Sequence, residues 1–194
     1  MKRAILLIPL ALANLSNGPA PEPVEPTPIV IVAEAPDTRA YDRAWSALVE
    51  KIGDELHIDS PELAETITLA VENASAEFDL NPWMIVSLIR VESMGDPTAV
   101  SKVGALGLTQ IMPRTGKEIA EDLHLAEYDL FDPATNVRMG SYYLGQLLER
   151  FEGNERAALA AYNYGPTAVS RMLRNGEPIP KVYAGKILQS LASL

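Results

Sequence analysis

A single glutamate interrupts an apolar stretch near the middle of this chain. Residues 82–94, PWMIVSLIRVESM, are apolar on nearly every side, which predicts a helix buried in the core. On such a helix Glu92 follows Ile85, Leu88 and Ile89 on one stripe, and no base stands three or four positions away. A carboxylate there loses hydration and lies near the negative end of the helix dipole, so we expect a raised pKa. A carboxyl group that keeps its proton near neutral pH can act as a general acid.

Two structural alternatives for Glu92 stay open at this point. Its side chain could pair with a distant base, or it could turn out to solvent at the end of the helix. Arg90 is a base on the same helix, but it points about 200° away around the helix axis. The other acid close by, Asp96, precedes Pro97, and we interpret it as the cap of a turn. Any acid chemistry of Glu92 would therefore proceed without a second carboxylate nearby in sequence.

Two further stretches carry groups that suit the binding of sugars. Residues 104–113, GALGLTQIMP, place Gln110 among apolar side chains, where a buried amide offers both a donor and an acceptor. This stretch lacks GK[ST] and GxGxxG, so it is neither a phosphate loop nor a dinucleotide fingerprint. Further along, AALAA leads into Tyr162 and Asn163, an aromatic face followed by an amide. The structural alternatives are a plain loop for the first stretch and a core position for Tyr162.

The elements that must position these residues are helices. Ser60, Asn81 and Asp132 each precede a proline, which places a capping side chain before a residue suited to the first helical turn. Glycines at 153, 165 and 176 stand where helices would end. The apolar spacing predicts helices at 39–57, 61–78, 82–94, 115–124, 133–151, 155–163, 166–174 and 181–193. Neither an alternating run long enough for a substantial sheet nor an internal repeat is visible, so we predict a mainly α domain with one core.

The N-terminal part of the chain has a different composition. Residues 1–13 combine Lys2 and Arg3 with a short apolar run that ends in a possible cleavage site, which predicts a signal peptide and export to the periplasm or cell envelope. An uncleaved apolar tail is the alternative. The run is too short for a membrane span, so none is expected in the mature protein. Residues 14–37 hold six prolines and four acids without a base, which favours an extended linker before a domain at 38–194.

Composition and charge exclude several classes of function. The chain has no Cys, and His57 and His124 belong to no metal-binding pattern, so we expect neither a metal site nor a cofactor. The net charge is −10, which disfavours binding to nucleic acid. The acids concentrate at residues 42–79, where ten acids stand with two bases. We interpret this block as a solvated helix surface, and a surface for an unidentified partner is the alternative.

Several motifs together resemble those of a known family. They are Glu92-Ser93, GALGLTQIMPRTG at 104–116, LFDPATNVRMGSYYLGQLL at 130–148 and ALAAYNYGP at 158–166. In this order and close to this spacing they resemble the catalytic domain of the soluble lytic transglycosylases, over residues 66–190. The resemblance implies a single, mainly helical, lysozyme-like domain related to goose-type lysozyme. It also implies cleavage of the β-1,4 bond between N-acetylmuramic acid and N-acetylglucosamine in peptidoglycan.

The resemblance also assigns roles to single residues. Glu92 matches the family's catalytic acid and base, and Tyr183 is similar to its late tyrosine, although the segment before Tyr183 is shortened. The other matches are residues that line the substrate groove, namely Ser101, Gln110, Met112, Tyr162 and Asn163. Thr109 departs from the family pattern, which commonly has Met there, and we expect this to reshape a wall of the groove.

The mechanism that the resemblance implies needs one carboxylate. Ordinary glycosidases use two. Here Glu92 would protonate the glycosidic oxygen and then accept the proton of the muramic acid 6-hydroxyl, giving a 1,6-anhydro product without water. The alternatives are a hydrolytic muramidase of goose-type lysozyme character and a noncatalytic peptidoglycan-binding scaffold of the envelope. The expected partner is the peptidoglycan glycan strand, with a further partner in the envelope or in secretion machinery unidentified.

Overall fold

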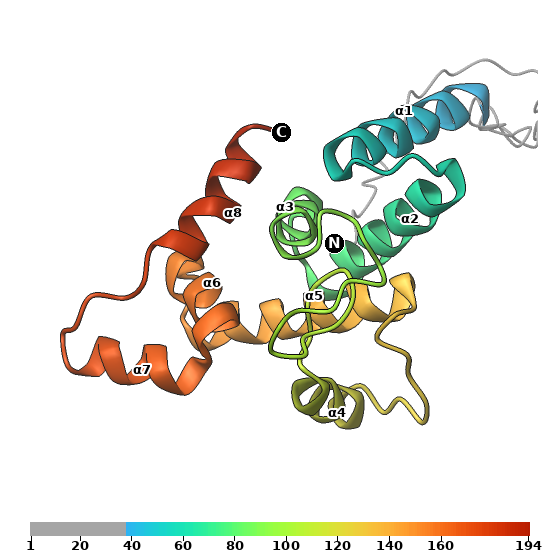
Figure 1. Cartoon of the computed structure of the whole chain (residues 1–194). Helices are drawn as coiled ribbons and strands as arrows, with labels where there is room; N and C mark the ends of the chain where they lie inside the picture. The colour runs from blue at the N-terminus through green and yellow to red at the C-terminus, as the bar shows by residue number, and fades with distance from the viewer. Residues whose placement is uncertain (1–37) are drawn as a thin grey trace, which may run out of the picture. The chain divides into compact units, whose positions relative to one another are not determined.

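The structure is a computed structural model that describes residues 38–194, so the predictions for residues 1–13 and 14–37 lie outside the described part. Within 38–194 the chain forms eight helices and no strand apart from isolated bridges, which confirms the predicted mainly α fold (Figure 1). The helices are α1 (Thr38–Leu56), α2 (Pro61–Phe78), α3 (Pro82–Glu92), α4 (Pro113–Asp122), α5 (Pro133–Arg150), α6 (Glu155–Tyr164), α7 (Pro166–Arg174) and α8 (Val182–Ala192).

The helix boundaries follow local chemistry. The side chains of Ser60, Asn81 and Asp132 accept backbone N–H groups in the first turns of α2, α3 and α5, and each is followed by proline, as predicted. Most boundaries agree with the prediction to within one residue, and the larger differences of two residues are in the third and fourth helices. The third helix ends at Glu92 instead of residue 94, because Met94 and Gly95 have φ angles of 56° and 82° that cannot continue a right-handed helix. The fourth begins two residues earlier than expected, at a proline that suits a first turn.

Helix α3 is the central element of the described domain. Its residues from 84 to 89 are all buried, as the apolar stretch predicts. One core cluster joins it to α1 and α2 through Ile52, Val71 and Ile85, and another joins it to α5, α6 and α8 through residues such as Leu88 and Ile187. Figure 1 shows α3 between the α1 and α2 pair on one side and α8 on the other. The end of α3 is therefore held from both sides.

A loop of residues 93–112 follows α3 and is anchored on α5. The buried Asn136 side chain of α5 accepts the N–H of Thr109 at 2.8 Å and donates to the carbonyls of Leu106 at 3.1 Å and Leu130 at 2.7 Å. Gly107 lies against the same amide, and a Cβ atom added to it would come within 2.3 Å of Asn136 Nδ2. The Asn136 amide thus holds the loop at Leu106 and Thr109 and the segment before α5 at Leu130, and both of its polar atoms are used.

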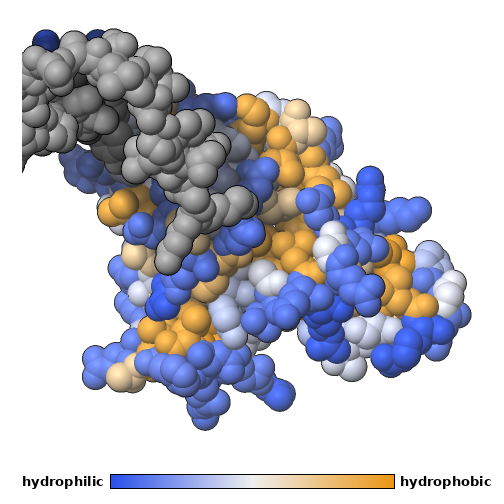
Figure 2. Space-filling view, turned by 180° about the vertical axis from the view of Figure 1, so that it is seen from behind, coloured by the Kyte–Doolittle hydropathy of each residue, from blue (hydrophilic) through white to orange (hydrophobic). Residues whose placement is uncertain are grey.

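The surface of the described domain mixes hydrophilic residues with smaller apolar patches, as the view from behind shows (Figure 2). None of the helices within residues 38–194 is long and apolar enough to cross a membrane. No group of three or more His, Cys, Asp or Glu side chains in this part of the chain is placed to hold a metal ion.

Candidate active site

Glu92 is the last residue of α3 and is half-buried. The Tyr183 hydroxyl of α8 donates a hydrogen bond to Glu92 Oε1. Burial raises the pKa of Glu92, and the Tyr183 hydrogen bond opposes that effect in part. The direction agrees with the sequence prediction and has the same main cause, loss of hydration.

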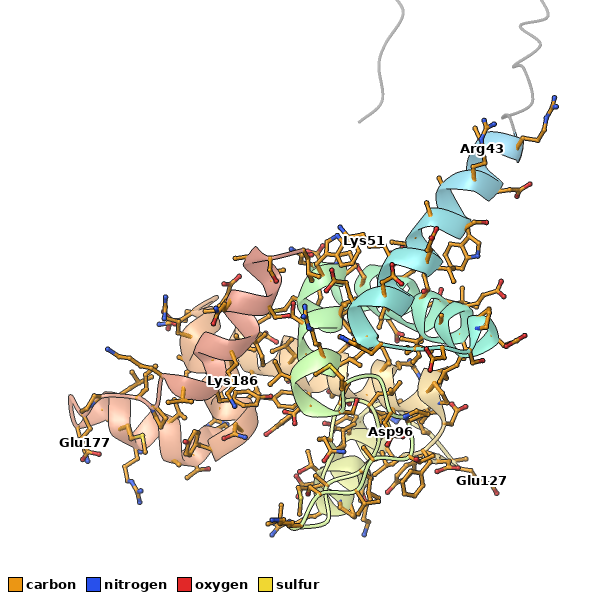
Figure 3. The ribbon with its side chains drawn as sticks, turned by 45° about the horizontal axis from the view of Figure 1, so that its top comes forward. Arg43, Lys51, Asp96, Glu127, Glu177 and Lys186 are labelled. Carbon is orange, nitrogen blue, oxygen red and sulfur yellow. The ribbon has the colours of Figure 1, made fainter. Side chains whose placement is uncertain are left out.

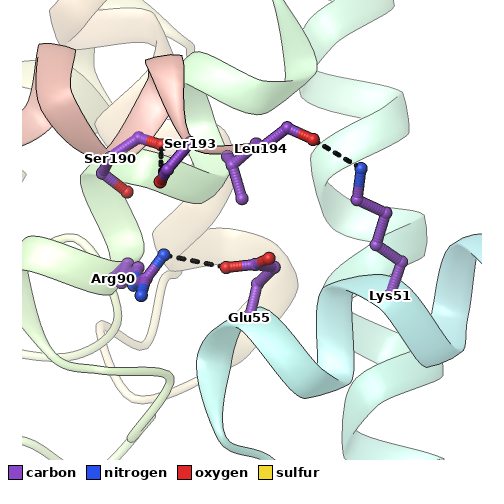
Figure 4. Close-up of polar contacts among 6 residues, drawn as sticks. All are labelled: Lys51, Glu55, Arg90, Ser190, Ser193 and Leu194. Atoms are coloured by element: carbon purple, nitrogen blue, oxygen red, sulfur yellow. Dashed lines mark hydrogen bonds and ion pairs between the residues drawn. The ribbon is translucent and has the colours of Figure 1, made fainter.

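The ion pair that was an alternative for Glu92 is absent among the described residues. Arg90 binds Glu55 of α1 instead, with Nη1 and Oε2 2.8 Å apart (Figure 4). Asp96 caps a turn, as predicted, because its Oδ1 accepts the N–H of Thr98 at 2.8 Å and its hydroxyl at 2.7 Å. Glu92 therefore faces a neutral phenol and no cation.

Two tyrosines surround the carboxyl group of Glu92. Burial is the largest cause that raises the pKa values of Tyr162 and Tyr183 above their ordinary value, and the nearby Glu92 charge raises both further. Both phenols therefore keep their protons at neutral pH. The Tyr162 hydroxyl donates to the Thr109 carbonyl at 2.9 Å, and its ring lies 5.2 Å from that of Tyr143. These contacts fix the Tyr162 ring between the loop and α5.

A pocket of about 270 Å³ lies beside Tyr162, between the loop and the end of α6. It brings together four of the predicted groove residues, namely Gln110, Met112, Tyr162 and Asn163. Tyr143 also lines it, although the sequence analysis did not single it out. The only signal for Tyr143 was an aromatic position on an amphipathic helix, which usually indicates the core. The pocket offers aromatic faces and amides, the groups that bind sugar rings and acetamido groups.

Two of the predicted residues use their polar groups inside the loop. The Ser101 hydroxyl accepts the N–H of Ala105 at 2.9 Å, and Ser101 does not line the pocket, so its place in a substrate groove stays a prediction. Gln110 has a φ angle of 52°, and its amide nitrogen donates to the carbonyls of Ala99 at 3.2 Å and Gly107 at 2.9 Å. Its side-chain oxygen is left as an acceptor for a ligand.

Thr109 differs from the expectation that it reshapes a wall of the groove. Its side chain is fully buried and turns towards α5, where Oγ1 donates to Asn136 Oδ1 at 2.7 Å. A Cβ atom on Gly140 of α5 would stand 2.3 Å from Thr109 Oγ1. The side chain thus contributes to loop packing, and only its carbonyl faces the site, as the acceptor of Tyr162.

A helical domain that ends its central helix with a half-buried glutamate, beside a pocket of phenols and amides, is of the lysozyme-like class. Similar solved structures support this class. The 70-kDa soluble lytic transglycosylase of Escherichia coli superposes with a TM-score of 0.61 at 27% identity, over 78% of this chain and 28% of that chain. An inactive glutamate-to-glutamine mutant of lytic transglycosylase Slt from Pseudomonas aeruginosa superposes with a TM-score of 0.53 at 26% identity, over 80% and 27% of the two chains.

A model of the Transglycosylase SLT domain matches residues 70–179, more than half of the chain, and the chain therefore belongs to this family. It is 33% identical over 118 residues to the transglycosylase of Enterobacteria phage PRD1, covering 61% of this chain and 40% of the phage protein. It is 37% identical over 94 residues to the soluble lytic murein transglycosylase of Escherichia coli K12, covering 46% and 15% of the two chains. The chain thus spans less than half the length of these relatives.

Proposed function

We propose that the protein is a lytic transglycosylase that cleaves the β-1,4 bond between N-acetylmuramic acid and N-acetylglucosamine in peptidoglycan. The observation that carries the proposal is the environment of Glu92, a half-buried carboxyl group of raised pKa whose partner is the neutral Tyr183 hydroxyl. Such a group holds a proton at a pH where an exposed glutamate has lost it. It is placed beside a pocket that suits a sugar chain.

In the proposed reaction Glu92 acts first as an acid and then as a base. Its proton passes to the glycosidic oxygen while the bond from that oxygen to C1 of the muramic acid breaks. The glucosaminyl hydroxyl leaves, and the carboxylate of Glu92 accepts the proton of the muramic acid 6-hydroxyl as its oxygen bonds to C1. The product is a 1,6-anhydro ring, Glu92 regains its proton, and no water is consumed. Tyr183 holds the carboxyl group in place through both steps.

Two further observations support a mechanism with one carboxylate. Asp96, the acid closest to Glu92 in sequence, is occupied by the turn that it caps. Among the similar solved structures, the Pseudomonas Slt mutant is inactive with glutamine in place of a glutamate. A 70-kDa soluble lytic transglycosylase has also been solved in complex with bulgecin A, and it superposes with a TM-score of 0.53 at 27% identity.

The place of action follows from the substrate and from the N-terminal sequence. Peptidoglycan lies outside the cytoplasmic membrane, and residues 1–13 have the pattern of a signal peptide. We therefore propose that the protein is exported to the periplasm or cell envelope. N-terminal sequencing of the mature protein from the envelope fraction tests this, with a new terminus after residue 13 as the expected result.

Mass spectrometry of the fragments released from intact peptidoglycan tests the activity itself. We expect products that end in 1,6-anhydromuramic acid, one water lighter than the corresponding reducing ends. Reducing ends from the purified protein would identify a hydrolytic muramidase. Binding to peptidoglycan without any release would identify a scaffold. The Glu92→Gln variant, purified in the same way, is the control for contaminating enzymes.

A further inference from the structure

A second hollow lies between α1 and α2, and we call it the α1–α2 groove. It has a volume of about 410 Å³ and shares no lining residue with the pocket beside Tyr162. Its lining residues all fall between 45 and 65, ahead of residues 70–179 that match the Transglycosylase SLT domain. The groove therefore lies outside the family match, and the proposed reaction gives it no role.

The floor of the α1–α2 groove is apolar. Gly53 and Ala64 are buried and let the two helices approach closely, since a Cβ atom on Gly53 would stand 3.3 Å from Ala64 Cβ. Trp45, Val49 and Ile58 also line the groove and are only half-buried. Aromatic residues in such hollows are typical anchors of protein interfaces. The floor thus leaves apolar surface for a large side chain of a partner.

The rim of the groove carries only negative charge. Two of its acids belong to α1, one to the turn before α2 and one to α2, and no base lines the groove. These acids are Glu50, Asp54, Asp59 and Glu65. None of them forms an ion pair with another residue of the described domain. The groove therefore fits a segment in which bases accompany a large apolar side chain.

Charge disfavours two occupants that the chain itself could supply. Residues 14–37 contain four acids and no base, so the rim would repel this segment. A two-fold contact uses the same surface on both copies, so two grooves that faced each other would bring the four acids of each copy together. The occupant therefore has to be basic.

Helix α7 has the complementary chemistry. Only Val169 of this helix is buried, and its last turn exposes Leu173 at 45%. Arg171 and Arg174 are three residues apart and share a face that Leu173 borders, and both are exposed without an ion pair in the described domain. Residues 166–186 around them hold four bases and one acid. An exposed leucine with two free arginines is what the groove requires.

The α1–α2 groove and α7 lie far apart on the domain. Figure 3 places Arg43 near the free end of α1 and Glu177 just after α7, at opposite ends, so α7 cannot enter the groove of its own copy. We propose that the groove binds α7 of a second copy of this chain. Leu173 packs on Trp45 in the floor, and the two arginines pair with acids of the rim. This contact is head-to-tail, so each end of the assembly keeps a free surface and can add another copy.

Salt should affect this association in two ways. The net charge of −10 repels whole copies at long range, and salt of about 0.1 M screens this repulsion beyond about 10 Å. The pairs between rim acids and arginines are short-range contacts, which only higher salt weakens. We therefore expect association to be strongest near about 0.1 M salt and weaker at about 1 M.

Analytical ultracentrifugation of the full protein over a range of concentrations tests the proposal. We expect the mean mass to rise with concentration. The apparent Kd should rise about tenfold or more when either surface is reversed in charge, by Asp54→Lys with Glu65→Lys or by Arg171→Glu with Arg174→Glu. A wild type that stays monomeric up to about 1 mM, or association that both reversals leave unchanged, overturns the proposal.

A mixture of the two reversed variants shows whether these two surfaces meet each other. The reversed groove of one variant is complementary to the reversed helix of the other, and the unchanged groove and helix are complementary as well. We expect the mixture to regain association that each variant alone has lost, and a mixture without recovery overturns the proposal. The matched controls are Glu127→Lys and Lys117→Glu, exposed positions outside both surfaces, which should associate like the wild type.

Fluorescence reports on the floor of the groove directly. The chain has two tryptophans, so Trp83→Phe leaves Trp45 as the only one. Its emission should shift to shorter wavelength as the concentration rises, and Leu173→Ala should weaken association about fivefold. A rising mass without a shift at Trp45 would place the contact elsewhere and overturn the proposal. Circular dichroism establishes that each variant is folded. None of these readouts uses peptidoglycan, so they are independent of the proposed activity.

Discussion

Glu77 and Glu92 lie on two surfaces of the domain, and their partners differ in charge. Glu77 of α2 binds Arg138 of α5 through two contacts of 2.7 and 2.8 Å on an exposed face. The Arg138 hydrogen bond lowers the pKa of Glu77. Glu92 is half-buried at the end of α3, where burial raises its pKa and its partner is the Tyr183 hydroxyl. The same side chain is thus an ion on one surface and an acid on the other.

The difference lies in the charge of the partner. A guanidinium is always protonated and positively charged, so it favours the carboxylate form of the glutamate beside it. A phenol is neutral and can donate only one hydrogen bond to the carboxylate, which compensates burial in part. The charge of the partner and the depth of burial together decide which glutamate stays protonated and can act as a general acid. Substitutions at the two glutamates and at their partners test this comparison.

The largest expected effect is on activity in the Glu92→Gln variant. The amide keeps the shape of the side chain but has no proton to give, so we expect the rate of release of anhydro products to fall by about 10² to 10⁴. The matched variant Glu77→Gln should keep the wild-type rate, because Glu77 does not line the pocket and its lowered pKa keeps it ionised at neutral pH. The rates are measured on intact peptidoglycan with folded proteins. Equal losses in both variants would show that the pKa difference has no bearing on catalysis.

A smaller effect is expected from Tyr183→Phe. Loss of the donor removes the contribution that lowers the pKa of Glu92, so this pKa should rise further. The alkaline limb of the kcat/KM profile should then move to higher pH, while the maximal rate falls about tenfold because the carboxyl group is less well positioned. The control is Tyr142→Phe, which removes the hydroxyl that donates from α5 to the Asp122 carboxylate of α4. A profile that shifts to lower pH would contradict the assigned direction.

The helices could be predicted from sequence because each has a local signal. Three helix starts were predicted from the capping residues Ser60, Asn81 and Asp132, and the structure confirms all three. The C-terminal end of α3 and both ends of α4 were misplaced by two residues. Helix α3 ends because Met94 and Gly95 have positive φ angles. Met94 gives no sequence signal for that left-handed conformation because it is not glycine.

Apart from the residues that the family motifs assign, the site was predictable only where a residue looked unusual in its own segment. Glu92 stood out on an apolar stripe, and its pKa direction followed from that alone. The Tyr183 hydrogen bond joins residues 91 positions apart, and no local pattern encodes such a contact. Asn136 was missed because an asparagine near a helix start usually indicates a cap, whereas here its amide binds Leu106 and Thr109 of the loop and Leu130 before α5. The direction of the Thr109 side chain depended on Gly140, 31 positions further on.

The two glutamates should also have opposite effects on stability. The folded-state pKa of Glu92 is raised above its unfolded value, so its ionisation favours the unfolded state as the pH rises through this range. We expect Glu92→Gln to be at least as stable as the wild type at pH 7, with the advantage vanishing below the ordinary glutamate pKa of 4.5. Urea denaturation between pH 4 and pH 8 measures the difference. A variant that is less stable at every pH would mean that packing, and not charge, dominates at this position.

The smallest expected effect is on the stability of Glu77→Gln. The folded-state pKa of Glu77 is lowered, so its ion pair stabilises the fold above the unfolded pKa, and this contribution is lost as the pH falls through the folded value. Both side chains are about 40% exposed, and solvent screening limits the loss to about 0.5 kcal/mol at pH 7. Urea denaturation should show this loss shrinking at low pH and in high salt. The loss at Glu77 would grow as the pH rises towards the ordinary glutamate pKa of 4.5, whereas the gain at Glu92 would grow as the pH rises above that value. Parallel pH dependences of the same sign would refute the assignment of one glutamate as an ion and the other as an acid.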